Sequence, residues 1–198
     1  MDMLTTTLSF ENMHMHGELM VNLLRARKQS FIVQNKWDLP EVAGMEYDQY
    51  DTPASSWIAV HEGERVMAGV RLTPTTARCG MYSYMLRDAQ KGMLDSIPSN
   101  LLFDEAPIDP RVLDATRVFV ARDVPAEQRM EVQTQLMEKL ISSARAMNAR
   151  EVLGLVPAVW PRWIRRLGLV AYAAGPVMLI DGVPVQVARM DLSNSHRH

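Results

Sequence analysis

The feature that most restricts the fold is a strand–helix–strand run between residues 115 and 156. A short β-branched and aromatic segment, ATRVFV at 115–120, is typical of a buried strand. The stretch at 126–149, AEQRMEVQTQLMEKLISSARAMNA, predicts the clearest helix in the chain because its apolar residues recur at helical spacing. An apolar strand is expected next, at 151–156. Since a crossover helix of this length joins parallel strands, the run predicts one parallel pair.

The remaining segments predict a largely antiparallel sheet with helices over it. Apolar residues of 17–33 share one helical face, and strands at 57–60 and 65–72 are joined by the turn HEGE. Asp-Gly between two apolar runs near the C-terminus favours a second hairpin. Other expectations are a long ordered loop at 34–55, a strand or helix start at 82–86, proline-broken turns at 92–112, and a basic helix at 159–167 ending at Gly168. The order indicates an α/β or α+β domain spanning 1–198.

Composition places the chain among ordinary globular proteins. Its 198 residues suit one well-packed domain, 47% are hydrophobic, and the formal charge is −2. That charge gives no reason to expect nucleic acid or an anionic membrane as a partner. No run reaches the ~18 apolar residues of a membrane span, and the N-terminus lacks the basic flank of a secretory signal. Cys79, the single cysteine, cannot form an internal disulfide, so we expect a cytoplasmic protein.

Common catalytic and metal-binding motifs are missing from the sequence. It contains no P-loop, no Gly-x-Gly-x-x-Gly dinucleotide motif, no HExxH and no Gly-x-Ser-x-Gly. The pair His14 and His16 and the pair His196 and His198 stand near opposite ends, so no metal site is expected. The 15 methionines suit irregular apolar cavities and are interpreted as core filling.

An acidic stretch, MEYDQYD at 45–51, comes just before the first strand of the predicted hairpin. It is either a solvated loop or one side of a charged pocket. Arg71 and Arg117 each lie inside an otherwise apolar strand, where a charge is costly to bury unless it is paired. These two arginines either alternate out to solvent or pair with the acidic stretch, with Arg27 joining from the first helix.

Five separated motifs resemble the N-acyl-homoserine-lactone synthases, the bacterial autoinducer synthases. Their order and spacing match from about residue 18 to 122, and the later segment GPVMLIDGVPV resembles the family's closing strands. The motifs are Arg27-x-x-x-Phe31, Trp37, Glu46-x-Asp48-x-x-Asp51, Arg71-Leu72-x-Pro74-Thr75 and Arg117-Val118-Phe119-Val120.

The resemblance implies a GNAT-like α/β acyltransferase fold, a twisted mixed β-sheet sandwiched between helices. It also implies an enzyme that joins S-adenosylmethionine, as a substrate and without a separate cofactor, to an acyl chain from acyl carrier protein or coenzyme A. In this family the methionyl amine attacks the acyl thioester, and the methionyl carboxylate then closes onto the γ-carbon. Lactonisation releases 5′-methylthioadenosine and yields a quorum-sensing signal.

The resemblance also assigns residues to the S-adenosylmethionine pocket. Arg27, Phe31 and Trp37 match its loop-rich wall, where an aromatic ring is suited to stack on adenine or to face the sulfonium.

Two carboxylates and two further arginines complete the assignment. Asp48 and Asp51 match carboxylates that support the pocket. Pairing of these carboxylates with Arg27 and Arg71 would keep a buried cluster neutral. Arg71 and Arg117 carry guanidinium forks that suit the methionyl carboxylate. Glu46 receives no role.

Asp114 departs from the family pattern. Relatives usually have Glu three residues before the arginine that matches Arg117, often proposed as the base that helps deprotonate the attacking amine. Asp shortens the reach by one methylene, which a water relay can restore. Gly154 aligns with a site where Thr or Ser accompanies 3-oxo acyl chains, so an acyl chain without that group is expected. Alternatively, Gly154 only lets strand and helix approach closely.

Two other functions stay open from the sequence. A different GNAT-type N-acyltransferase would use acyl-CoA and another amine, but its usual Arg/Gln-x-x-Gly-x-Gly/Ala loop is absent from VARDVPAEQ. A non-catalytic protein that binds a nucleoside or an acyl chain is supported only by the Asp114 departure. Late arginines either steer an acidic acyl carrier protein or form a solvated basic face. They are Arg145, Arg150, Arg162, Arg165 and Arg166.

Overall fold

The structure, a computed structural model, describes residues 2–166 and 168–193. It divides into two compact units, each built from two chain segments. The first unit holds the chain up to residue 72 together with 117–143, and the second holds 73–116 together with the chain from 144 onward. Strands β5 (Arg65–Pro74) and β6 (Val112–Val120) therefore contribute residues to both units. The single domain over 1–198 stays a prediction.

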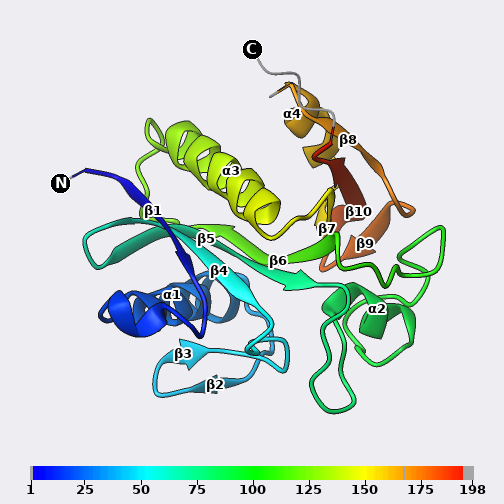
Figure 1. Ribbon diagram of the computed structural model, residues 1–198, viewed down its shortest axis with the longest axis horizontal. Coiled ribbons are helices and arrows are strands. Elements are labelled where there is room, and N and C mark those ends of the chain that lie inside the picture. Colours follow the sequence, from blue (N-terminus) through cyan, green and yellow to red (C-terminus); the bar gives the residue numbers. More distant parts are fainter. Residues whose placement is uncertain (1, 167, 194–198) are drawn as a thin grey trace. The chain divides into compact units, whose positions relative to one another are not determined.

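In the first unit the strands follow the order β1-β4-β5-β6, and β4 pairs antiparallel with both β1 and β5. Helices α1 and α3 lie on opposite sides of these strands (Figure 1). The elements, besides β5 and β6, are β1 (Leu4–Leu8), the 3₁₀ turn η1 (Met13–Met15), α1 (Leu19–Arg27), the π-helical η2 (Lys28–Gln34), β2 (Glu41–Val42), β3 (Met45–Glu46), β4 (Ser56–Glu62) and most of α3 (Arg129–Ala146).

One hydrophobic core joins α1 and η2 to the strands of this unit. Leu23 of α1 and Phe31 of η2 pack with Trp57 of β4 and Phe119 of β6 in one buried cluster. Arg27 follows Leu23 by four positions and therefore lies on the same face of the helix. The helical period thus directs a guanidinium into the interior, where it requires partners.

In the second unit the strand order is β6-β7-β10-β8, with β9 paired to β10. The β6–β7 pair is parallel and runs only from Val112 to Asp114 on β6, whereas β10 is antiparallel to its neighbours. Asp181 and Gly182 both have positive φ, +50° and +75°, as a two-residue hairpin turn requires. The unit's other elements are α2 (Met85–Gln90), β7 (Glu151–Pro157), α4 (Trp160–Arg166), β8 (Val170–Ala173), β9 (Met178–Ile180) and β10 (Val183–Asp191).

Most of the expected elements are confirmed. The parallel crossover, both hairpins, the long helix and the helix at 160–166 are present. At 82–86 the helix start is the correct alternative, because α2 begins at Met85 and the Asp88 carboxylate accepts hydrogen bonds from the Ser83 amide and hydroxyl. No helix within 2–166 and 168–193 is long and apolar enough to cross a membrane.

Two expectations need correction, and one strand was not expected. The helix at 17–33 is an α-helix only to Arg27 and continues as a π-helix, and the loop at 34–55 contains the small β2–β3 hairpin. Strand β1 is not among the expected elements because its central threonines are polar. Those threonines are β-branched and suit a strand beside β4, and the Thr6 hydroxyl lies 2.9 Å from His61 Nε2.

Candidate functional site

Six charged side chains of the first unit form one buried network, called here the ion cluster. Helix α1 supplies one arginine at its last residue, and strands β5 and β6 supply the other two. The carboxylates come from β3 and from the loop that follows it. The cluster consists of Arg27, Arg71, Arg117, Glu46, Asp48 and Asp51.

Arg27 joins two of the carboxylates. Its Nε donates to Glu46 Oε2 at 2.6 Å, while Nη1 and Nη2 donate to the two oxygens of Asp51 at 2.7 and 2.9 Å. The paired donation to Asp51 is the bidentate geometry in which a guanidinium binds a carboxylate most strongly.

Arg71 lies deepest in the cluster. Its side chain has no exposed surface, and Nη1 and Nη2 donate to Asp48 at 2.5 and 3.2 Å. Nη1 also lies 2.9 Å from Asp51 Oδ1. The alternative in which Arg71 alternates out to solvent is therefore wrong, and its pairing with the acidic stretch is confirmed.

Arg117 is the most exposed of the three arginines, with 11% of its side-chain surface accessible. Its Nη2 lies 2.8 Å from Asp48 Oδ2, and its Nε donates to Glu46 Oε1 at 3.1 Å. The solvent alternative is wrong for Arg117 as well. Its backbone φ is +56°, a left-handed conformation that costs a non-glycine residue roughly 1–2 kcal/mol. Strained backbone of this kind is often found at functional sites.

The charges within the cluster control its protonation. Burial alone would raise the pKa of Asp51, but hydrogen bonds and charges from Arg27 and Arg71 lower it well below its ordinary value. Burial also acts to raise the pKa of Asp48, and the charges of Arg71 and Arg117 outweigh it and lower that pKa. For Arg27 and Arg71, burial would lower the pKa, and the neighbouring carboxylates raise it instead. Asp48, Asp51, Arg27 and Arg71 therefore stay ionised at neutral pH. By formal charge, the three arginines of the cluster match its three carboxylates.

An aromatic group borders the cluster. The rings of Phe31 and Trp37 stack at 5.1 Å with 8° between their planes, and Phe119 meets Phe31 edge-on at 5.9 Å. The Arg117 guanidinium carbon lies 5.7 Å above the Phe31 ring, within cation–π range. Phe31 is buried and Trp37 is half-buried, so the indole is the more accessible of these two stacked rings.

Asp114 and Gly154 belong to the second unit. Asp114 is fully buried on β6, and its Oδ2 accepts a hydrogen bond from the Leu86 amide at 3.3 Å. Burial and the charge of Asp114 raise the pKa of Tyr84 above its ordinary value. At Gly154 an added Cβ would lie 3.1 Å from the Ala115 carbonyl oxygen, so β6 and β7 approach closely there.

Glu46 is the member of the site that the resemblance left without a role. It has no exposed surface and joins Arg27 to Arg117, from α1 to β6. Its place in the motif Glu46-x-Asp48 is a usable signal, because alternate residues of an extended segment lie on the same side.

Other candidate groups show no comparable constellation. Within the described ranges no three His, Cys, Asp or Glu side chains are grouped as metal ligands, and His196 and His198 lie outside those ranges. Among the late arginines, Arg145 and Arg165 donate to the backbone oxygens of Leu192 and Ala171. Arg150 pairs with Asp109 at 3.1 Å.

Comparison with known proteins identifies the family. The model of the family described as "Autoinducer synthase" matches residues 11–198. The chain belongs to the autoinducer synthase family. The acyl-homoserine-lactone synthase of Ralstonia nicotianae is 29% identical over 180 residues, covering 87% of this chain and 82% of the relative. The acyl-homoserine-lactone synthase of Aeromonas salmonicida is likewise 29% identical, over 174 residues, covering 85% of this chain and 77% of that one.

Solved structures of similar proteins share the fold. TofI in a ternary complex with an inhibitor and MTA superposes with a TM-score of 0.75 at 24% identity, covering 98% of this chain and 94% of that one. The GNAT-like α/β fold expected for an autoinducer synthase is therefore confirmed. The family resemblance seen in the five motifs is confirmed as well.

Proposed function

We propose that this member of the autoinducer synthase family is an acyl-homoserine-lactone synthase. It would transfer an acyl chain from acyl carrier protein or coenzyme A to S-adenosylmethionine, which is a substrate and not a cofactor. The family match over residues 11–198 is the observation that carries the proposal. The buried ion cluster supports it, because every one of its six members lies within the motifs that define the resemblance.

Within the first unit, we assign the S-adenosylmethionine contacts to the accessible groups. Arg117 retains exposed surface, so its guanidinium is the one suited to the methionyl carboxylate. Trp37 has an accessible indole for adenine or the sulfonium. Arg27, Asp48, Asp51 and Arg71 are positioning residues, since their charges are already satisfied inside the cluster, and the buried Phe31 ring supports Trp37.

The reaction needs a base at the first step. The methionyl nitrogen forms a bond to the thioester carbonyl carbon, the carbon–sulfur bond of the donor breaks, and one proton leaves the amine. Asp114 is the proposed acceptor of that proton, through a water molecule because the carboxylate is buried. In the second step a methionyl carboxylate oxygen bonds to the γ-carbon, and the bond from that carbon to sulfur breaks. 5′-Methylthioadenosine leaves as a neutral thioether.

Gly154 and the late arginines bear on which acyl chain and which acyl donor the enzyme uses. Gly154 brings no hydroxyl group, which favours an acyl chain without a 3-oxo group, and its acyl-chain pocket remains a proposal. The late arginines are candidate contacts for an acidic acyl carrier protein. Both substrates and an exposed single cysteine, Cys79, suit a reducing cytoplasm.

A turnover assay tests the synthase proposal. Purified protein is incubated with S-adenosylmethionine and a panel of acyl carrier protein and coenzyme A thioesters, and 5′-methylthioadenosine is followed by chromatography. Release that requires both substrates supports the proposal. Acyl transfer without 5′-methylthioadenosine would indicate the GNAT-type N-acyltransferase, and binding without any transfer would indicate the non-catalytic relative.

A further inference from the structure

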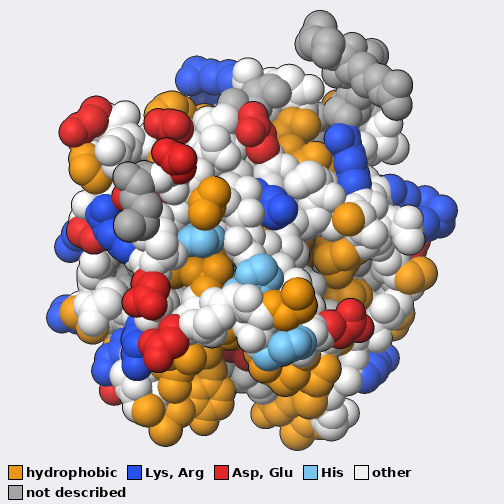
Figure 2. Space-filling view, turned by 60° about the vertical axis from the view of Figure 1, so that its left-hand side comes forward, with side chains coloured by type: hydrophobic (Ala, Val, Ile, Leu, Met, Phe, Trp, Pro, Cys, Tyr) orange, Lys and Arg blue, Asp and Glu red, His pale blue; other side chains and the backbone are white. Residues whose placement is uncertain are grey.

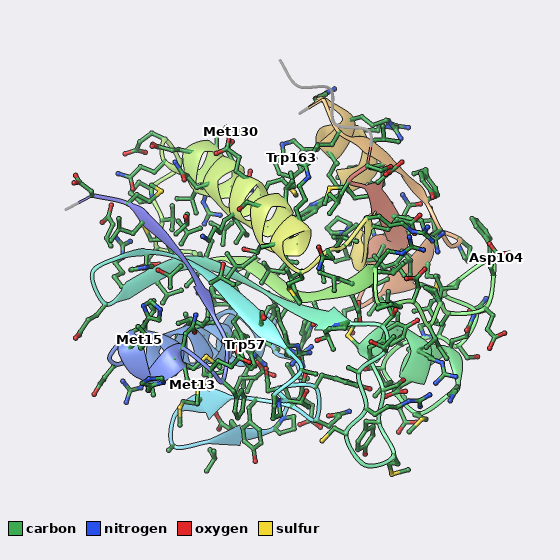
Figure 3. All side chains as sticks on the ribbon, viewed as in Figure 1. Met13, Met15, Trp57, Asp104, Met130 and Trp163 are labelled. Carbon is green, nitrogen blue, oxygen red and sulfur yellow. The ribbon has the colours of Figure 1, made fainter. Side chains whose placement is uncertain are left out.

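An apolar pocket of about 350 Å³ lies within the first unit and has no part in the proposed reaction. The segment before α1, helix α1, hairpin β2–β3 and strand β4 all contribute to its walls. Figure 3 shows two of the lining side chains, Met13 and Trp57, on neighbouring elements beside α1. Neither Trp37, Phe31 nor Arg117 is among the residues that line it.

The mouth of the pocket carries large hydrophobic side chains that are exposed. Val42 of β2 is 55% exposed, and Tyr47 and Phe10 are 45% and 44% exposed. Met20 and Leu24 extend the apolar wall along one face of α1, four residues apart. Figure 2 shows hydrophobic side chains gathered along the lower edge of the face that it displays. Exposed apolar surface that is also concave is typical of a binding site.

Among the described residues, Asp51 is the one charged member of the pocket lining, and its carboxylate is already saturated. Its Oδ1 accepts hydrogen bonds from Arg27 Nη1 and Trp57 Nε1, at 2.7 and 2.9 Å. Its Oδ2 accepts from Arg27 Nη2 and from the Asp48 amide, both at 2.9 Å. A carboxylate offers about four lone-pair positions, so none remains for a ligand. A charged ligand would therefore gain no charged partner from the lining residues.

We propose that this pocket binds a neutral molecule through an unbranched acyl chain. The three methionines in the lining, Met13, Met20 and Met45, have flexible thioether side chains that adapt to a chain of variable shape. The volume falls within the usual range for small-molecule sites. A neutral acylated ligand has two sources, a neutral lipid or an N-acyl-homoserine lactone. The second source rests on the proposed function, since the lactone would be its product.

The occupant would also touch the wall of the ion cluster. Trp57 lines the pocket, and its Nε1 donates to the same Asp51 oxygen that accepts from Arg27. The indole N–H resonance of Trp57 therefore reports on the pocket without any turnover.

The test uses four probes on isotope-labelled full-length protein, followed by nuclear magnetic resonance. Octanamide is the neutral chain, octanoate and octylammonium are its charged analogues, and N-octanoyl-homoserine lactone represents the product. We expect octanamide to shift the Trp57 indole signal saturably, with both charged analogues binding at least ~10-fold more weakly. Tighter binding of the lactone than of octanamide would support the product as the natural ligand. Equal binding would support recognition of the chain alone.

A matched pair of variants locates the binding. Val42→Glu places a charge at the mouth of the pocket. Val183→Glu makes the same change at a comparably exposed valine, 49% accessible, in the second unit. Val42→Glu is expected to weaken octanamide binding ~10-fold or more, and Val183→Glu to leave it unchanged.

Three results would overturn the pocket proposal: an unshifted Trp57 signal, binding of a charged analogue as tight as that of octanamide, or full affinity in Val42→Glu. Failure of the synthase proposal is distinguishable, because it is read from turnover. An inactive protein whose Trp57 responds to octanamide would contradict only the synthase proposal. An active enzyme whose Trp57 does not respond would contradict only the pocket.

Discussion

Replacing Asp51 by Asn removes one negative charge from the ion cluster and keeps the shape of the side chain. The change leaves Arg27 and Arg71 with one carboxylate too few in a region where Arg71 has no exposed surface. Breaking a buried ion pair by removing one partner costs about 3–5 kcal/mol. A protein of this size has roughly 5–15 kcal/mol of total stability, so the variant would lose a large part of it.

Urea and thermal unfolding of Asp51→Asn measure this cost. A loss of this size corresponds to a fall in melting temperature of roughly 6–20 °C. Asp123→Asn is the matched control, because Asp123 pairs with Arg65 at 3.2 Å but is 69% exposed. An exposed pair contributes only about 0–1 kcal/mol. Circular dichroism before unfolding establishes that each variant is folded.

The double variant Asp51→Asn with Arg27→Met tests whether the loss of charge balance causes the loss of stability. If charge balance is the cause, the double variant is more stable than the sum of the two single losses predicts, because it restores neutrality. Equal small losses for Asp51→Asn and Asp123→Asn would refute the reasoning. Strict additivity in the double variant would refute it as well.

Three further predictions concern acid stability, catalysis and packing. Because the pKa values of Asp48 and Asp51 are lowered in the folded protein, these carboxylates stabilise the fold fully above the ordinary carboxyl pKa of ~4, and this contribution is lost as the pH falls below it. Urea midpoints measured from pH 7 downward should therefore fall less steeply in Asp51→Asn than in the wild type. Asp114→Asn should reduce 5′-methylthioadenosine release about 10²–10⁴-fold, while calorimetry should show an unchanged affinity for S-adenosylmethionine. An equal loss of S-adenosylmethionine binding would instead assign Asp114 a structural role. Gly154→Ala should lower the free energy of unfolding, measured in urea, by about 1–3 kcal/mol, because the added Cβ would lie 3.1 Å from a backbone oxygen. An unchanged midpoint would show that β6 and β7 can move apart there.

Periodic and turn signals predicted the secondary structure where local rules decide it. The crossover helix showed its period of 3.6 and the second hairpin its Asp181-Gly182 turn, and both are confirmed. Strand β1 gave a weak signal because a threonine-rich segment of five residues is defined by its neighbour β4 and not by its own pattern. Likewise, no sequence signal marked the end of α1 at Arg27, where the chain continues as a π-helix that carries the buried Phe31.

The residues of the candidate site were recognised from their motifs, but their roles were not separated. Arg71 and Arg117 looked alike, each a charge within an apolar strand. In the structure Arg71 is fully enclosed, and Arg117 keeps an exposed edge and a strained backbone. Burial by distant segments causes this difference, and no local pattern encodes it.

By itself, the sequence determined a domain of mixed helices and strands and the order of most elements, because these depend on periodicity and turn residues. Its five motifs indicated the family by resemblance. Only the tertiary structure decided which charges meet. Glu46 contacts Arg117 across 71 positions of the chain, and Phe10 and Val42 line one pocket from separate segments. Such contacts are fixed by how α1 and the β2–β3 hairpin pack on the strands of the first unit. The energy of a buried charge depends on all of its neighbours together. The role of each charged residue is therefore defined only in the folded protein.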